Sequence, residues 1–158
     1  MSSDLIVKEV WDDGDLGVMG WHDVTIWSMV ADPDKYEFLV DMDYIFKWVD
    51  PADGEVYYKF WIAPVTMIFE NAHTIDIDIE SQHGGIEIDA LHRENPRPTP
   101  NGKLTQHCYR FECQEGEIKL YSTGFKMFVR QPPLLVQQQS LSLSSRGGVC
   151  FARGASAT

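Results

Sequence analysis

Residues 74–80 read Thr-Ile-Asp-Ile-Asp-Ile-Glu, and this stretch decides the fold class. Apolar and acidic residues alternate one by one, which is the pattern of a β-strand with one buried and one exposed face. Residues 86–90, Ile-Glu-Ile-Asp-Ala, repeat the pattern after the turn residues 83–85, His-Gly-Gly. The two stretches together predict an antiparallel hairpin with an acidic outer face.

The same alternation recurs through residues 24–130. In residues 38–48 every second side chain is apolar, and the opposite face carries Asp41, Asp43 and Lys47. This pattern predicts a second long strand with one apolar face and one acidic face.

Turn residues separate the expected strands. Residues 50–54, Asp-Pro-Ala-Asp-Gly, predict a hairpin turn onto residues 56–63. Counted in this way, the chain is all-β, an antiparallel sandwich or partly open barrel of about seven or eight strands with at most one or two short helices. An α+β fold with one helix from residues 1–15 or 132–140 is the alternative.

The length of 158 residues and mass of 18.0 kDa predict a single β-rich domain over residues 1–158. Residues 144–158 are rich in Ser, Gly and Ala, so we expect a loosely ordered tail there. The apolar runs are only a few residues long, which argues against a membrane-spanning helix of about 20 residues.

Charge is distributed unevenly along the chain, whose formal net charge is −11. Residues 1–100 hold 21 acids and six bases, whereas residues 101–158 hold three acids and seven bases. An acidic chain is a poor candidate for binding nucleic acid or anionic lipid. The charge therefore favours a basic protein partner, with plain solubility as the alternative.

The three cysteines, Cys108, Cys113 and Cys150, are odd in number and form no C-x-x-C pair. We therefore expect neither a disulfide framework nor a thiolate zinc site. Free thiols fit a reducing compartment, and the N-terminus shows no basic region followed by an apolar stretch. A cytoplasmic location is the expectation.

One candidate site is an acidic sheet face that engages a protein partner. Carboxylates two residues apart on a strand lie about 7 Å from one another on the same face. If the two acidic strands were neighbours, five carboxylates would share one surface and would need a basic partner or hydration. The predicted partner-binding residues are Asp41, Asp43, Asp76, Asp78 and Glu80.

A second candidate site is a pocket for a small ligand, lined by aromatic side chains within the β fold. The predicted lining residues are Trp21, His22, Asp23, Trp27, Trp48 and Trp61. Simple packing of these rings in the core is the alternative. The sequence contains no G-x-S-x-G, Walker or G-x-G-x-x-G motif, so we expect no enzymatic activity, catalytic residue, cofactor or metal.

Three stretches carry a resemblance to known proteins. These are residues 20–24 (Gly-Trp-His-Asp-Val), residues 39–48 (Leu-Val-Asp-Met-Asp-Tyr-Ile-Phe-Lys-Trp) and residues 63–71 (Ala-Pro-Val-Thr-Met-Ile-Phe-Glu-Asn). They resemble small uncharacterised bacterial β-rich proteins, some of them similar to immunity proteins of bacterial toxin systems. The resemblance covers about residues 20–80 and implies a bacterial, cytoplasmic, non-enzymatic protein. It implies no functional residues.

These observations favour a binding module whose acidic face engages a protein partner, such as a basic toxin. The small-ligand pocket is the alternative function. A third interpretation is an assembly component, because residues 75–79 are a natural edge strand for pairing with a partner or with a second copy in a homo-oligomer.

Overall fold

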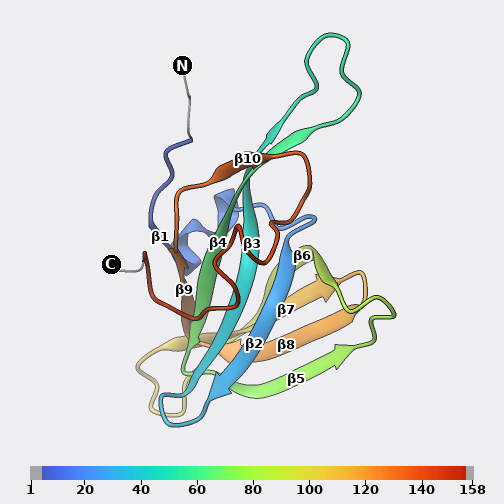
Figure 1. Ribbon diagram of the computed structural model, residues 1–158. Helices are drawn as coiled ribbons and strands as arrows, with labels where there is room; N and C mark the ends of the chain where they lie inside the picture. Colours follow the sequence, from blue (N-terminus) through green and yellow to red (C-terminus); the bar gives the residue numbers. More distant parts are fainter. Residues whose placement is uncertain (1–4, 156–158) are drawn as a thin grey trace.

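The computed structural model describes residues 5–155. Ten strands within this range form one antiparallel β-sheet (Figure 1). The strands are β1 (Val10–Asp12), β2 (Thr25–Asp32), β3 (Glu37–Val49), β4 (Lys59–Glu70), β5 (His73–Ile79), β6 (Ile86–Pro98), β7 (Thr105–Cys113), β8 (Gly116–Ser122), β9 (Gly124–Val129) and β10 (Leu134–Val136). The predicted all-β class is confirmed, with ten strands instead of seven or eight. The 3-10 helix η1 (Asp13–Val18) is six residues long, and residues 5–155 contain no helix that could span a membrane.

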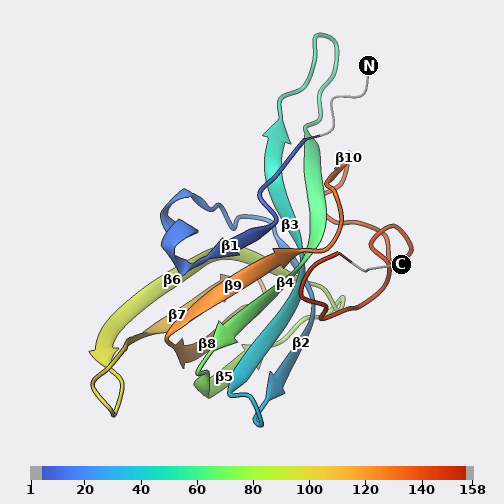
Figure 2. The same cartoon turned by 90° about the vertical axis from the view of Figure 1, so that its left-hand side faces the viewer.

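The sheet consists of two halves joined by a short ladder. Its strand order is β1-β9-β4-β3-β2-β6-β7-β8-β5, with β10 paired to β4. Only two residue pairs link β2 to β6, so β1-β9-β4-β3-β2 is called the first half and β6-β7-β8-β5 the second half. The strands of the two halves run steeply across one another (Figures 1 and 2). The sheet stays open, because β1 and β5 end the order without pairing to each other.

The main core lies between the inner faces of the two halves. Phe69 of β4 packs against Tyr109 and Phe111 of β7, with ring centroids 5.2 and 5.8 Å apart. Val40 and Met42 of β3 belong to the same cluster and are fully buried. The alternating apolar side chains of β3 therefore point inward, as the period of two requires, whereas Ile77 of β5 stays 48% exposed.

The predicted β3–β4 hairpin is confirmed, although its loop is longer than the turn at residues 50–54, because the second strand resumes only at Lys59. Pro64 sits inside β4 between two partner strands, where a missing N–H is normally costly. Its carbonyl accepts a hydrogen bond from the Arg130 N–H, just beyond the last residue of β9. The N and O atoms of a strand residue point to the same side. The N–H that Pro64 lacks would therefore face the gap between the end of β9 and the start of β10, where it is not needed for strand pairing.

The predicted hairpin between residues 74–80 and 86–90 is wrong. β5 pairs with β8, and β6 pairs with β7 and β2, so β5 and β6 lie at opposite edges of the second half. The turn at residues 83–85 carries the chain from one edge to the other. Residues 75–79 do form an edge, because β8 is the only strand within residues 5–155 that pairs with β5.

The chain after β10 covers the outer face of the first half (Figure 1). Residues 137–155 are called the C-terminal segment. Its Leu141 packs on Ile45 and Ile62 in a second apolar cluster. The alternative helix at residues 132–140 is absent, because Leu134–Val136 pairs with β4.

The expected loosely ordered tail, residues 144–158, includes one side chain that is anchored in the fold. Arg146 is among the most buried polar residues of the described chain, and its side chain is held by two aspartates of β3. The last three residues of that expectation, 156–158, lie outside the described range.

Candidate functional site

The structure separates the five predicted acidic residues into two groups. Asp41 and Asp43 are buried on the outer face of the first half, whereas Asp76, Asp78 and Glu80 are exposed in or just after β5. Four strands, β2, β6, β7 and β8, lie between β3 and β5 in the sheet. The expected shared acidic surface is therefore wrong for Asp41 and Asp43, because the C-terminal segment covers them.

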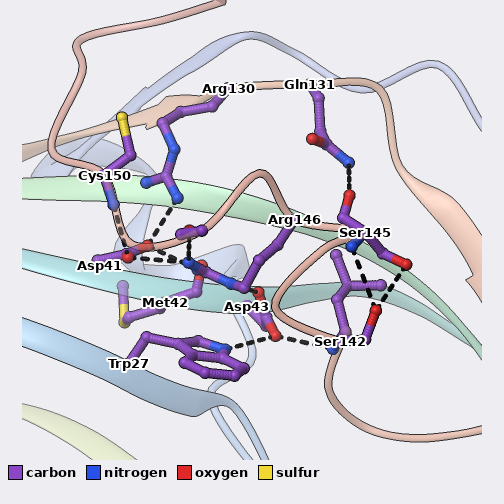
Figure 3. A network of polar contacts seen from close by, with 12 residues as sticks. Trp27, Asp41, Met42, Asp43, Arg130, Gln131, Ser142, Ser145, Arg146 and Cys150 are labelled. Carbon is purple, nitrogen blue, oxygen red and sulfur yellow. Dashed lines mark hydrogen bonds and ion pairs between the residues drawn. The ribbon is translucent and has the colours of Figure 1, made fainter.

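Asp41 and Asp43 form a buried ion cluster with two arginines (Figure 3). The Arg146 guanidinium donates from Nη2 to Asp41 Oδ1 at 2.6 Å and from Nε to Asp43 Oδ1 at 3.0 Å. Arg130 donates from Nη2 to Asp41 Oδ1 at 2.7 Å and from Nη1 to Thr66 Oγ1 at 2.8 Å. Two carboxylates and two guanidinium groups balance in charge, which is the condition for keeping such groups out of water.

Neutral donors complete the hydrogen bonding of the two carboxylates. Trp27 Nε1 and the Leu141 backbone N–H each donate to Asp43 Oδ2 at 2.8 Å, and the Cys150 N–H donates to Asp41 Oδ2 at 3.1 Å. The Trp27 ring also packs against the Arg146 guanidinium, 4.8 Å from the ring centroid. The cluster thus joins β2, β3 and the C-terminal segment.

The charge state of Arg146 is fixed by its surroundings. Burial alone would lower the pKa of this guanidinium, but the hydrogen bonds and charges of Asp41 and Asp43 raise it above its ordinary value. All three groups are buried, so the cluster fastens the C-terminal segment to the sheet and offers no surface to a partner.

Sequence reasoning missed Arg130 and Arg146 as partners of the two aspartates. The signal that pointed to them was the charge asymmetry, because acids dominate residues 1–100 and bases dominate residues 101–158. Part of that asymmetry is an ion cluster that forms only when the end of the chain folds back on β3.

The acids of β5 are exposed but do not form a purely acidic face. Lys119 of β8 lies beside Asp76, with Nζ 4.0 Å from Oδ2. On the same outer face Arg110 of β7 donates to Glu94 at 2.8 Å. Bases therefore alternate with acids across the second half, and the outer face of β5 has mixed charge.

The predicted aromatic pocket is formed in part. Trp21, His22 and Trp48 line one hollow of about 350 Å³. Asp23 adjoins it, 3.5 Å from His22 Nε2, and accepts a hydrogen bond from Gln139.

Two of the predicted lining residues do not reach this hollow. Trp27 lies under Arg146, and Trp61 sits in β4 opposite Leu135 of β10. Trp21 lines the hollow, and its indole N–H is buried without a hydrogen-bond partner among residues 5–155.

Several exposed apolar side chains near this hollow lie in or beside the β3–β4 loop, which projects well beyond the sheet (Figures 1 and 2). Val56 is 78% exposed, Tyr57 80%, Tyr58 45% and Trp48 40%. These four residues are called the aromatic arm. The rings of Trp48 and Tyr58 meet edge to face at 5.9 Å, and all four residues of the arm line one hollow.

Hollows and charges surround the aromatic arm. Trp48 is shared by the hollow of about 350 Å³ and by a second of about 420 Å³, which Tyr57 and Tyr58 also line. Three exposed acids, Asp50, Asp53 and Glu55, occupy the loop itself. Sequence analysis selected Trp48 but missed Val56 and Tyr57, because the alternating pattern placed Val56 at the start of a strand.

Within residues 5–155 no three His, Cys, Asp or Glu side chains are grouped so that they could hold a metal ion. In comparisons with known proteins, no family model matches the sequence, and no curated protein or solved structure shows significant similarity to it.

Proposed function

We propose that the chain is a non-enzymatic binding module that engages a protein partner through the aromatic arm. The observation that carries this proposal is the exposure of Val56, Tyr57 and Tyr58 on one projecting loop, with the exposed ring of Trp48 at its base in β3. A soluble protein rarely leaves large apolar side chains together in water without a use for them. Tyr and Trp are also the residues that most often anchor protein interfaces.

The charge around the aromatic arm favours a basic partner. Asp50, Asp53 and Glu55 are exposed in the same loop, and the whole chain has a formal net charge of −11. Acidic groups at the rim of an interface accelerate association with a basic surface and make the rate fall with added salt. A basic toxin is a partner of this type, which agrees with the resemblance to immunity proteins.

The buried ion cluster supports the arm indirectly. It fastens the C-terminal segment onto β3, and Gln137, Gln138 and Gln139 of that segment line the second hollow beside Trp48 and Tyr58. A rigid base holds the projecting rings in place and limits the entropy lost on binding.

The test starts with a partner captured from the source organism, purified, and titrated calorimetrically against the chain. We expect the double substitution Val56→Ser with Tyr57→Ser to weaken binding about thirtyfold or more, as truncation of interface anchors does. Replacing Asp50, Asp53 and Glu55 with their amides should slow association and flatten its salt dependence.

The matched control removes three charges from the opposite region. Asp76→Asn, Asp78→Asn and Glu80→Gln together should leave affinity unchanged. If these substitutions abolish binding and the arm substitutions do not, the acidic edge is the contact surface and the arm proposal is wrong. All the substituted side chains are exposed, so circular dichroism should show an unchanged fold.

A second candidate function is binding of a small ligand in the hollow lined by Trp21, His22 and Trp48. The unpartnered Trp21 indole N–H favours it, because a buried donor without an acceptor is costly and a ligand oxygen would satisfy it. Quenching of tryptophan fluorescence by a metabolite, lost in Trp21→Phe, would support this function.

A further inference from the structure

One pocket of the described chain is distinct from the aromatic arm. It is an open groove of about 740 Å³ that includes Arg97 and the β6–β7 loop at residues 99–104. This loop and the β3–β4 loop lie at opposite ends of the molecule in both views (Figures 1 and 2). The groove therefore needs an explanation separate from the proposed function.

Arg97 supplies the positive charge of the groove. Among residues 5–155 it is the one arginine whose side chain makes no hydrogen bond or ion pair to another residue. The side chains of Arg93 and Arg110, by contrast, are hydrogen-bonded. The Arg97 guanidinium instead lies over the ring of Tyr121, with the central carbon 3.8 Å from the centroid. A stacked guanidinium keeps its N–H groups free in the plane of the fork, where they can bind a carboxylate with two parallel hydrogen bonds.

The polar side of the groove is held rigidly. The ring of His73 stacks on Tyr121 with centroids 5.7 Å apart, and its Nε2 lies 2.6 Å from Gln106 Oε1. Gln106 is buried and donates in turn to the Pro98 carbonyl at 3.3 Å. The ring under Arg97 is thus fixed in position before any ligand arrives.

The backbone beside His73 is strained. Thr74 has a φ of +53°, and Asn71, which lines the groove, has a φ of +50°. A β-branched residue is rarely found in this region, and such strain is concentrated at functional sites.

The other side of the groove is apolar. Pro98, Pro100 and Leu104 line it, and Leu104 is 54% exposed. Pro98 and Pro100 have fixed φ angles, so this wall also loses little entropy when a ligand covers it.

We propose that the groove binds a small organic carboxylate, with its carboxylate on the Arg97 guanidinium and its apolar body against Leu104 and the two prolines. One unpaired guanidinium balances one negative charge. A phosphate monoester would carry nearly two charges, and Arg97 is the only Lys or Arg among the residues that line the groove.

The test uses 2-naphthoate and its neutral counterpart 2-naphthamide, titrated into the full-length ¹⁵N-labelled chain and followed by NMR. We expect 2-naphthoate to bind about tenfold more tightly, with the amide signals of Thr99, Leu104 and Gln106 shifting. Arg97→Gln should make the two affinities equal. Leu104→Ser should weaken both ligands and leave their ratio unchanged.

Lys103→Gln is the matched control, because Lys103 lies in the same loop but does not line the groove. It removes the same charge and should leave the preference for 2-naphthoate intact. Equal affinity of the two ligands for the unmodified chain would overturn the proposal. So would an equal loss in Lys103→Gln, or shifts confined to residues 56–58 of the arm. Because Arg97, Lys103 and Leu104 are exposed, the remaining spectrum reports that each variant is folded.

Discussion

Asp41-Met42-Asp43 and Asp76-Ile77-Asp78 have the same spacing on two strands of one sheet, yet their carboxylates end in opposite environments. The first pair is fully buried and bound by Arg146, whereas the second is exposed at the edge strand β5. Both pairs point away from the core between the two halves. The difference is that the C-terminal segment covers the outer face of the first half.

This contrast shows that alternating acids indicate which face of a strand points toward the inner core. They do not indicate whether the opposite face is covered or exposed to solvent. The alternating pattern places the residue between the acids on the opposite face, where Met42 is fully buried and Ile77 is 48% exposed. An acid on the other face stays in water unless a second layer brings a cation and enough donors to replace that water. Here Arg146, Arg130 and the Leu141 and Cys150 N–H groups supply them.

Removing Arg146, the cation that Asp41 and Asp43 share, should have the largest effect on the free energy of unfolding. Arg146→Met leaves Asp41 and Asp43 buried with half of their positive charge gone, and we expect a loss of about 3–5 kcal/mol in the free energy of unfolding. Lys119→Met, which removes the cation beside exposed Asp76, should cost less than about 0.5 kcal/mol. Urea denaturation of both variants measures the difference.

A salt series provides a control for the Arg146 prediction. Because the cluster is buried, the cost of Arg146→Met should change little between low and high salt. A cost below about 1 kcal/mol would contradict the buried pairing, and so would a cost that vanishes in salt.

The two aspartate pairs can also be compared by the same substitution in each. Asp43→Asn keeps the shape of the side chain but removes the charge that holds Arg146, Trp27 and Leu141, and we expect a loss of about 1.5–3 kcal/mol. Asp78→Asn should change stability by no more than about 0.5 kcal/mol. Thermal unfolding of both variants tests this. Equal losses in the two variants would mean that burial beside Arg146 does not make Asp43 more important for stability than the exposed Asp78.

Local sequence signals predicted the β class but not the pairing of every strand. The alternation in residues 74–80 and 86–90 identified two strands, and the glycines between them suggested a hairpin. The pairing of β5 with β8 depends instead on residues 116–121, which no local pattern connects to β5.

The candidate site shows the same limit. Asp41 and Asp43 were recognised as a pair, but their partner Arg146 is more than 100 residues away in the sequence. Of the four residues of the aromatic arm, the sequence analysis selected only Trp48. Its exposure depends on where β4 begins, and strand ends are set by pairing rather than by residue type.

Glu87 is a third case beside Asp43 and Asp78, because its carboxylate is neither paired with an arginine nor fully exposed. It lies at the junction of the two halves, opposite Thr25 of β2. Burial raises its pKa above the ordinary value of 4.5, and the charges of Asp23, Glu115 and Asp89 raise it further, while His22 lowers it. A carboxyl group without an arginine in this position should therefore weaken the fold when it ionises.

The direction of the pH effect follows from this raised pKa. Well below pH 4.5 both the folded and the unfolded chain hold the proton, so Glu87 has little effect on stability. As the pH rises, the unfolded chain releases its proton first, and the free energy of unfolding falls until the folded chain has released it too. Glu87→Gln removes this fall and should gain up to about 0.5 kcal/mol over the unmodified chain at neutral pH.

Urea denaturation at pH 4, 5.5 and 7 measures this gain, with the exposed Glu112→Gln as the control. The advantage of Glu87→Gln should grow from pH 4 to pH 7, and Glu112→Gln should show no comparable trend. An advantage that is constant with pH, or largest in acid, would mean that ionisation of Glu87 does not weaken the junction. Glu87 would then behave like the exposed Asp78, and only Asp43, which is paired with Arg146, would depend on its surroundings.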